Sequence, residues 1–384
     1  MWGVPQHRCI VCWLSISLAS CRCAATESTS ELVNLWSLDS LHGRKCGVAV
    51  NPKNEGRGPG FTPAMLKSGD AYGLAWQTSW THDGIQPGFS PADYGSVALV
   101  SQFWDATDVD FVLPSGPIIP VMLGFNEPDQ SFGGGAGMDV TEAVNSWMYL
   151  VGKARMAGYQ YFVAPSIAQG LPSRYTGQSG GNEWLPQFLQ GCLEKLGCAE
   201  TVDYLGFHLY EPRCPTDPAV VRKWSMDVRV GSMKRLMLEF NGKGMNIKGL
   251  WLTEFAGRSD GAGLCRTLAQ QRGWLEVIVP MLNSDPAIVA YSWFSYGDGH
   301  SPFFHDNANL WDYSTNQPNE LGQAYFRLCS TRPAGGGTSV RLVFLWMIAI
   351  VILLIVIISV VSRCNAEATA TRSGDVQLGP LLRR

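Results

Sequence analysis

Two glutamates stand where apolar, β-rich runs of the sequence end. Glu127 lies in the segment LGFNEPD and Glu254 in the segment WLTEFA. Hydrolysis of a glycosidic bond needs two carboxyl groups, one protonated to help the leaving oxygen depart and one ionised to attack the sugar or to activate water. A carboxylate at the mouth of an apolar sheet is also where desolvation can tune ionisation. The pair therefore has the residue types and the placement that this chemistry requires.

Each glutamate also has a purely structural interpretation. Asn-Glu-Pro-Asp is an acceptable way to leave any strand, and Asp129 could cap the next segment. Glu254 could be a buried acid that pairs with Arg258 or Arg266. Two acids at the ends of two different strands are harder to explain in this way, and we take catalysis as the leading interpretation.

The elements that would position these residues recur along the chain as short apolar runs. Eight runs are predicted as strands: Gly47–Val50, Gly73–Trp76, Val109–Leu113, Val121–Phe125, Tyr161–Ala164, Tyr204–Leu209, Leu250–Thr253 and Val289–Phe294. Helical patterns lie between the later runs: Thr141–Ala157, Trp184–Leu196, Ala219–Phe240 and Leu264–Leu282. The third run, DFVLPSGPIIP, leads almost directly into the fourth, which leaves little room for a helix there.

This alternation is typical of a parallel sheet that helices cover on both faces. We expect an α/β fold, a (β/α)8 TIM barrel, whose usual length is about 250 residues. A doubly wound open sheet is the structural alternative. Barrel enzymes place their chemistry at the carboxyl ends of the strands, and polar residues follow the apolar runs there: Asn126, Glu127, His208, Tyr210 and Glu254.

Aromatic side chains serve as platforms in a glycan cleft because a pyranose ring presents an apolar face. Among the 14 tryptophans, Trp76 and Trp293 sit at predicted strand ends and are our candidates for substrate binding. Trp80, in the loop that follows, is a weaker candidate. Trp251 alternates out of phase with Glu254 and is expected to pack under a helix.

Five segments, in this order, resemble glycoside hydrolase family 128: LGFNEPD, WLPQF, VDYLGFHLY, WLTEFA and AYSWFSY. The resemblance covers roughly Lys45 to Tyr325. The family it resembles belongs to the large clan of retaining barrel glycosidases and is known for endo-β-1,3-glucanase activity. The resemblance implies a β-glucan polysaccharide or oligosaccharide as substrate, and it implies no metal or organic cofactor.

The resemblance also implies roles for single residues. Glu127 takes the acid/base role and Glu254 the nucleophile role, with the carboxyl groups about 5 to 5.5 Å apart as retention requires. Asn126 would donate a hydrogen bond to the sugar 2-hydroxyl, Tyr210 would hold Glu254 ionised, and His208 would bind a sugar hydroxyl. A turn cap for Asn126, or a buried and satisfied core side chain for His208 and Tyr210, is the structural alternative.

Two other functions stay open. One is another glycosidase of the same clan that acts on a β-1,4-linked glucan or on mannan. The other is a non-catalytic, membrane-anchored glycan-binding receptor, against which the presence of both Glu127 and Glu254 argues.

The two ends of the chain predict a membrane protein of the secretory pathway. Residues 1–25 resemble a signal peptide, with an uncleaved signal anchor as the alternative. Residues 26–332 would form the catalytic domain and 333–341 a Gly-rich linker. Leu342–Val361 is an unbroken apolar run that matches a membrane span, and 362–384 would be a short cytosolic tail. We expect a single-pass type I protein whose catalytic domain is extracellular or lumenal.

The net charge bears on whether the protein binds nucleic acid, and the cysteine content bears on whether it forms disulfides. The formal net charge is −3 without a long basic run, so nucleic acid is not an expected partner. Of 11 cysteines, six fall within the predicted catalytic domain: Cys46, Cys192, Cys198, Cys214, Cys265 and Cys329. An even number in an oxidising compartment predicts disulfides, although the connectivity stays open.

Overall fold

The computed structural model describes residues 45–50, 62–71, 73–80, 91–108, 118–131, 134–168, 170–177, 181–258, 264–296 and 306–330. All of them belong to one of the chain's two compact units, Asn34–Arg384. The predicted signal peptide, linker, membrane span and tail lie outside the described residues. Among the helices that the structure does describe, none is both long enough and apolar enough to cross a membrane.

Eight parallel strands form one sheet. They are β1 (Cys46–Ala49), β2 (Trp76–Thr78), β3 (Ala98–Gln102), β4 (Ile118–Leu123), β5 (Tyr161–Val163), β6 (Leu205–Glu211), β7 (Leu250–Gly257) and β8 (Ile288–Phe294). The order in the sheet is β5-β4-β3-β2-β1-β8-β7-β6, so β1 pairs with both β2 and β8. Isolated parallel bridges, Val163 to Tyr204 and Ile167 to Phe207, join the two outer strands and nearly close the ring. The predicted barrel is confirmed.

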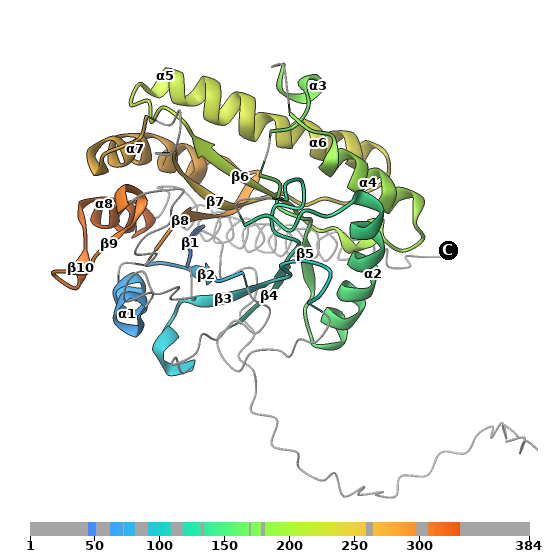
Figure 1. Cartoon of the computed structure of the whole chain (residues 1–384), viewed down its shortest axis with the longest axis horizontal. Coiled ribbons are helices and arrows are strands. Elements are labelled where there is room, and N and C mark those ends of the chain that lie inside the picture. Colours follow the sequence, from blue (N-terminus) through green and yellow to red (C-terminus); the bar gives the residue numbers. More distant parts are fainter. Residues whose placement is uncertain are drawn as a thin grey trace, which may run out of the picture. The chain divides into compact units, whose positions relative to one another are not determined.

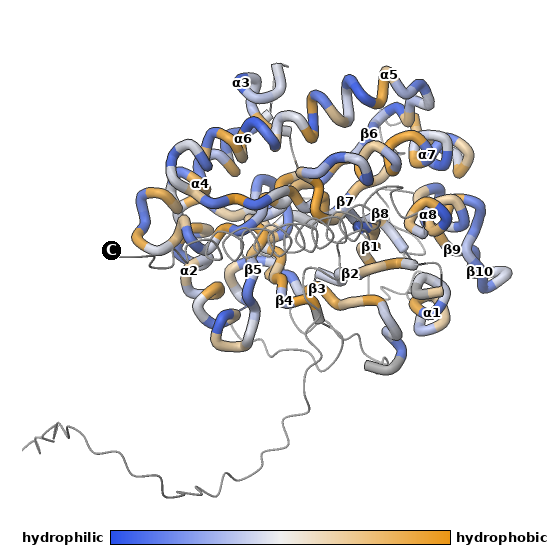
Figure 2. The backbone as a smooth tube through the Cα atoms, turned by 180° about the vertical axis from the view of Figure 1, so that it is seen from behind, coloured by the Kyte–Doolittle hydropathy of each residue, from blue (hydrophilic) through white to orange (hydrophobic). Residues whose placement is uncertain are grey.

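Helices surround the strands (Figure 1). They are α1 (Pro63–Ala71), α2 (Val140–Met156), α3 (Ser173–Thr176), α4 (Trp184–Glu194), α5 (Pro218–Val221), the π-helical η4 (Arg222–Val230), α6 (Gly231–Gly242), α7 (Leu268–Ser284) and α8 (Glu320–Ser330). Shorter 3-10 turns are η2 (Pro91–Tyr94), η3 (Ala199–Thr201) and η5 (Asp306–Ala308), and β9 (Trp311–Asp312) pairs with β10 (Gln317–Pro318) in a small antiparallel sheet. Hydrophobic and hydrophilic stretches alternate along several helices, as expected where one face is buried (Figure 2).

Local sequence explains where the main helices begin. Asp139 caps α2 by accepting hydrogen bonds from the backbone N–H groups of Thr141 and Glu142. Thr267 and Gln270 form a reciprocal capping box at the start of α7, so this helix begins at Leu268 rather than at the predicted Leu264.

Two predicted strands are misplaced. The third strand is Ala98–Gln102, whereas the predicted Val109–Leu113 lies outside the described residues. The second strand begins at Trp76, where the predicted run Gly73–Trp76 ends. Ala98–Gln102 reads ALVSQ, and its last two residues are polar because they lie near the carboxyl edge of the sheet, so apolarity alone does not reveal them.

The barrel has two hydrophobic regions. The larger one lies between the sheet and the helices, and a smaller one includes Trp76, Trp251 and Tyr204. Trp251 packs on Trp76 with ring centroids 5.2 Å apart, so the prediction that it lies under a helix is wrong. Gly47 makes room for Trp76, because a Cβ there would lie 2.2 Å from the indole.

All six cysteines predicted to pair are in disulfides. Cys46 of β1 bonds to Cys329 of α8. Cys192 of α4 bonds to Cys198, which follows that helix. Cys214 bonds to Cys265 and links the loops that follow β6 and β7. The last of these bonds connects loops at the carboxyl edge of the barrel.

Candidate active site

Glu254 points to the mouth of the barrel because β7 contains a bulge. Pairing with β6 runs from Phe207–Leu252 directly to His208–Glu254, which leaves Thr253 unpaired. Thr253 then donates a hydrogen bond to Ser166 Oγ at 2.8 Å, across the barrel. Both Thr253 and Glu254 therefore face inward, although neighbours in a regular strand face opposite sides.

Both carboxylate oxygens of Glu254 accept hydrogen bonds from aromatic side chains. Trp80 Nε1 donates to Oε1 at 2.6 Å, and the Tyr210 hydroxyl donates to Oε2. The residue is only 5% exposed. Burial and the neighbouring Glu127 raise the pKa of Glu254, while His208 and these two donors act in the opposite direction by favouring the ionised form.

Glu127 follows β4 in a constrained turn. Its backbone φ is 44°, in the left-handed region that non-glycine residues seldom adopt. Its N–H donates to Ser166 O at 2.9 Å, and its carbonyl accepts from Gln130 N at 3.1 Å. The side chain, which is almost completely buried, accepts a hydrogen bond from the Gln130 amide on Oε2. Such a held, unusual conformation is common where a side chain has to be aimed at a substrate.

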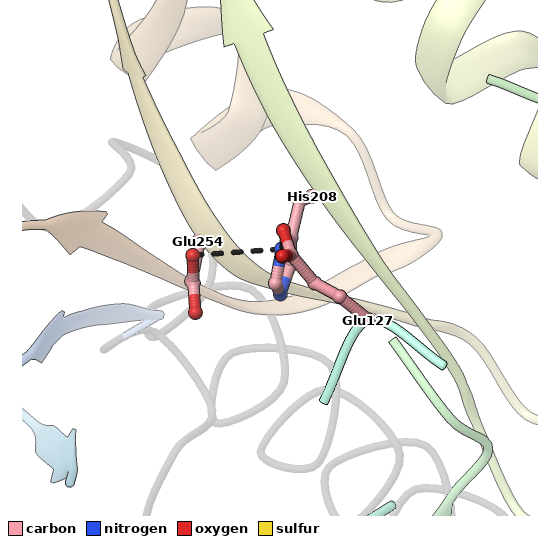
Figure 3. Close-up of side chains that lie close together, drawn as sticks. All are labelled: Glu127, His208 and Glu254. Atoms are coloured by element: carbon pink, nitrogen blue, oxygen red, sulfur yellow. Dashed lines mark hydrogen bonds and ion pairs between the residues drawn. The ribbon is translucent and has the colours of Figure 1, made fainter. Parts of the chain in front are cut away.

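His208 lies between the two glutamates. Its Nδ1 is 2.8 Å from Glu127 Oε1 and 3.5 Å from Glu254 Oε2 (Figure 3). Burial by itself lowers the pKa of His208, but the charges of Glu254 and Glu127 outweigh it and raise the pKa above its ordinary value. Burial and both carboxylates also raise the pKa of Tyr210, so its hydroxyl stays protonated and can donate.

The two carboxyl groups are close together. One oxygen from each glutamate and one His208 nitrogen all lie within 4.8 Å of one another. Retaining glycosidases keep their carboxyl groups about 5 to 5.5 Å apart, whereas inverting enzymes leave about 6.5 to 9.5 Å for a water molecule. The same three side chains are a possible ligand set for a metal ion. One oxygen of each glutamate already accepts a hydrogen bond, Glu254 Oε1 from Trp80 and Glu127 Oε2 from Gln130.

Asn126 lies beside Glu127 and is held by neighbouring residues. Gln102 Nε2 donates to Asn126 Oδ1 at 3.3 Å, and Asn126 Nδ2 donates to Gly134 O at 3.2 Å. The structure thus brings Asn126, Glu127, His208, Tyr210 and Glu254 to one end of the barrel, as their places after the strands predicted.

The two tryptophans that the sequence suggested as sugar platforms do not reach the site. Trp76 is fully buried inside the barrel, where its Nε1 donates to Lys45 O at 3.0 Å. Trp293 is fully buried on the outer face of β8, with its ring 5.0 Å from Phe255 and its Nε1 donating to Ala308 O. Neither ring can offer a face to a ligand, so both assignments are wrong.

Sequence reasoning undervalued three residues of the site. Trp80 was a weaker candidate for sugar stacking, yet it donates to Glu254. Gln130 contacts Glu127, and Gln102 contacts Asn126. Gln130 lies three residues after Glu127, so its closeness in sequence could have suggested the contact. Gln102 is the last residue of β3, a strand that the sequence pattern did not reveal.

The comparisons with known proteins concern the family and the fold of the chain. The model of the glycosyl hydrolase catalytic core family matches residues 67–325. An endo-β-1,3-glucanase of glycoside hydrolase family 128, subgroup II, from Sorangium cellulosum is 25% identical, with 76% of this chain and 100% of that chain covered and a TM-score of 0.53. The comparison with curated proteins gave no match.

Two further solved structures share the fold. A subgroup V exo-β-1,3-glucanase from Cryptococcus neoformans is 20% identical over 75% of this chain and 100% of that chain, with a TM-score of 0.54. A subgroup I endo-β-1,3-glucanase from Amycolatopsis mediterranei, in complex with laminaritriose, is 22% identical over 74% and 99%, with a TM-score of 0.50. The chain belongs to the glycosyl hydrolase catalytic core family and, within it, to glycoside hydrolase family 128.

Proposed function

We propose that this protein is a retaining endo-β-1,3-glucanase, with Glu127 as general acid/base and Glu254 as nucleophile. The observation that carries the proposal is the close, buried pair of carboxyl groups at the mouth of the barrel, with an oxygen of each within 4.8 Å of the other. This separation leaves too little room for the water that an inverting enzyme places between its carboxyl groups. The similarity to the Sorangium cellulosum endo-β-1,3-glucanase supports the choice of a β-1,3-glucan and of endo action.

The contacts of the two glutamates support this division of roles. Glu254 accepts a hydrogen bond on each oxygen, from Trp80 and from Tyr210, and these bonds favour the ionised form that a nucleophile needs. Glu127 contacts His208 Nδ1 and the Gln130 amide, groups that tolerate either protonation state of a carboxyl group. Glu127 can therefore give up a proton and regain it within one catalytic cycle.

In the first step, a Glu254 oxygen bonds to the anomeric carbon while the glycosidic C–O bond breaks. The electron pair goes to the leaving oxygen, which takes the proton of Glu127. Asn126, oriented by Gln102, would donate to the sugar 2-hydroxyl, a contact that strengthens as positive charge develops on the ring. His208 contacts both glutamates and keeps their side chains aligned.

In the second step, Glu127 acts as a base. It takes a proton from water, the water oxygen bonds to the anomeric carbon, and the bond to Glu254 breaks. The electron pair returns to the Glu254 carboxylate, where Trp80 and Tyr210 donate hydrogen bonds to it again. Two displacements at the same carbon leave the product with the β configuration of the substrate.

The test is hydrolysis of laminarin, a soluble β-1,4-glucan and β-mannan by the purified full-length protein. Glu127→Gln and Glu254→Gln keep the side-chain shape and remove the carboxyl chemistry, and Glu142→Gln, at an exposed position of α2, is the matched control. We expect laminarin cleavage into a mixture of oligosaccharides, retained by the control and reduced by orders of magnitude in both site variants. Release of glucose alone would indicate exo action, and folded wild-type protein that binds laminarin without cleaving it would indicate a receptor.

We also propose that the catalytic domain is tethered to a membrane of the secretory pathway through residues 342–361. The apolar character of this segment, in which Ser359 is the one polar residue, and the signal-like residues 1–25 support the proposal. The protein should resist extraction by alkaline carbonate, and deletion of 342–361 should release it into the soluble fraction. Soluble behaviour of the intact chain after carbonate treatment would contradict the tether.

A further inference from the structure

Trp80 occupies a constrained position beside Glu254. It lies two residues after the end of β2, and its backbone φ is 54°, in the left-handed region. A tryptophan is costly in this conformation, so surrounding contacts have to hold it there. Its Nε1 donates to Glu254 Oε1 at 2.6 Å, a short bond of the kind that an N–H donor makes to a charged carboxylate.

A third aromatic ring joins the two donors of Glu254. The ring of Phe294, at the end of β8, meets Trp80 edge to face with centroids 5.5 Å apart. The same ring meets Tyr210 edge to face at 6.1 Å. Edge-to-face contacts of this kind fix the relative orientation of rings. Each oxygen of Glu254 thus accepts a hydrogen bond, and the two donors, Trp80 and Tyr210, both pack against the ring of Phe294.

We infer that Trp80 is a positioning residue of the reaction, whose indole N–H holds the Glu254 carboxylate ionised and stabilises it as the leaving group of the second step. The inference rests on the proposed function, because it assigns Trp80 a role through the nucleophile. It differs from sugar stacking in using the N–H edge of the indole rather than its face. The two donors come from different parts of the barrel, since Tyr210 lies on β6 and Trp80 follows β2.

The two chemical steps should respond differently to loss of this N–H. In the first step Glu254 loses negative charge as its oxygen bonds to the anomeric carbon, so a hydrogen bond to the carboxylate stabilises the starting state more than the transition state. In the second step the bond from the anomeric carbon to the Glu254 oxygen breaks and the charge returns to the carboxylate. A donor on Oε1 then stabilises the transition state, so its removal should slow this step.

Trp80→Phe removes the N–H and keeps an aromatic ring. The assay uses full-length protein and 2,4-dinitrophenyl β-laminaribioside, whose leaving group needs no proton, so that the second step limits kcat. We expect kcat to fall about tenfold, the loss of one charge-assisted hydrogen bond, with KM falling at least in proportion, so that kcat/KM at its pH optimum does not decrease. The acidic limb of the pH profile of kcat/KM should move about one pH unit higher, because ionised Glu254 loses a donor. Rapid mixing should show a larger burst of dinitrophenolate.

Trp224→Phe, at a partly exposed position of η4, is the matched control and should leave the kinetics and the pH profile unchanged. Phe294→Leu removes the ring shared by the donors but keeps the Trp80 N–H, and it should shift the acidic limb in the same direction by less. Thermal unfolding shows whether each variant is folded. If Trp80→Phe lowers kcat/KM while KM rises, or leaves the acidic limb in place, Trp80 acts by substrate contact or packing and the inference is wrong. Failure of wild-type protein to cleave laminarin would instead overturn the proposed function itself.

Discussion

Replacement of Glu127 by alanine tests the acid/base role most directly. The residue already adopts a φ of 44°, so alanine introduces no new backbone strain, and the substitution removes the carboxyl group together with its contacts to His208 and Gln130. General acid assistance is worth about 10² to 10⁴ in rate, or about 3 to 5 kcal/mol in the activation free energy. Laminarin, whose sugar leaving group needs a proton, should lose that full amount. A dinitrophenyl glycoside needs no proton to depart, so its first step should be nearly unaffected.

The same variant tests the stereochemistry that the site geometry implies. Removal of the carboxyl group leaves a buried space between Gln130 and His208, which a small anion such as azide can enter. Azide should restore turnover of the dinitrophenyl substrate and give a β-glycosyl azide, because it attacks from the side that Glu127 faces. Glu254→Ala with azide should give the α-glycosyl azide, because azide then replaces the nucleophile. Product analysis by NMR distinguishes the two anomers.

Two results would refute this reasoning. Equal loss of kcat/KM, which reports the first step, on laminarin and on the dinitrophenyl substrate would show that Glu127 does not act by protonating the leaving group. An α-configured first product from wild-type protein and laminarin would show that the enzyme inverts, despite carboxyl oxygens within 4.8 Å of each other. Glu142→Gln again serves as the control for changes unrelated to the site.

Three further predictions concern pH and stability. Because burial raises the pKa of Glu254 and this residue has to be ionised to attack, activity should fall as the pH drops, and the acidic limb of kcat/KM should lie above the ordinary glutamate value of 4.5. Replacing Cys46 and Cys329 by alanine opens a bond that spans 283 residues and should lower the free energy of unfolding by up to about 5 kcal/mol, measured by denaturant titration. Gly47→Ala would place a Cβ 2.2 Å from buried Trp76 and should cost about 1 to 3 kcal/mol in the same measurement, unlike Gly152→Ala, which meets no atom within 4 Å.

The alternation of apolar strands with helices was sufficient to predict the barrel, because a helix follows most of the strands and the pattern is local. It also placed Asn126, Glu127, His208, Tyr210 and Glu254 at one edge, since parallel strands end together. The strand Ala98–Gln102 was missed although Val97–Val100 is a continuous apolar run, because the later run Val109–Leu113 was predicted as the third strand instead. Ser101 is satisfied by the Tyr159 hydroxyl at 2.5 Å, a partner that lies far along the chain.

The orientation of side chains around the site was decided by tertiary structure. Strict alternation along β7 would put Glu254 on the face opposite Trp251, and that reasoning sent Trp251 to the wrong side of the sheet. The bulge at Thr253 lets Glu254 face inward on the same side as Trp251, and no residue type in WLTEFA predicts the bulge. Which face of the sheet a side chain takes after a bulge depends on how the strand pairs with its neighbours. A single sequence does not show this pairing.

The sequence by itself determined the fold class, the two acids and the even set of paired cysteines, because each leaves a local or compositional pattern. Only the tertiary structure decided which tryptophan serves the site. Trp76 and Trp293 end up in tightly packed interiors, whereas Trp80, carried to Glu254 from 174 positions away in the chain, supplies a hydrogen bond. Burial and contact depend on the three-dimensional path of the whole chain, and a residue's type and place in the sequence do not determine them.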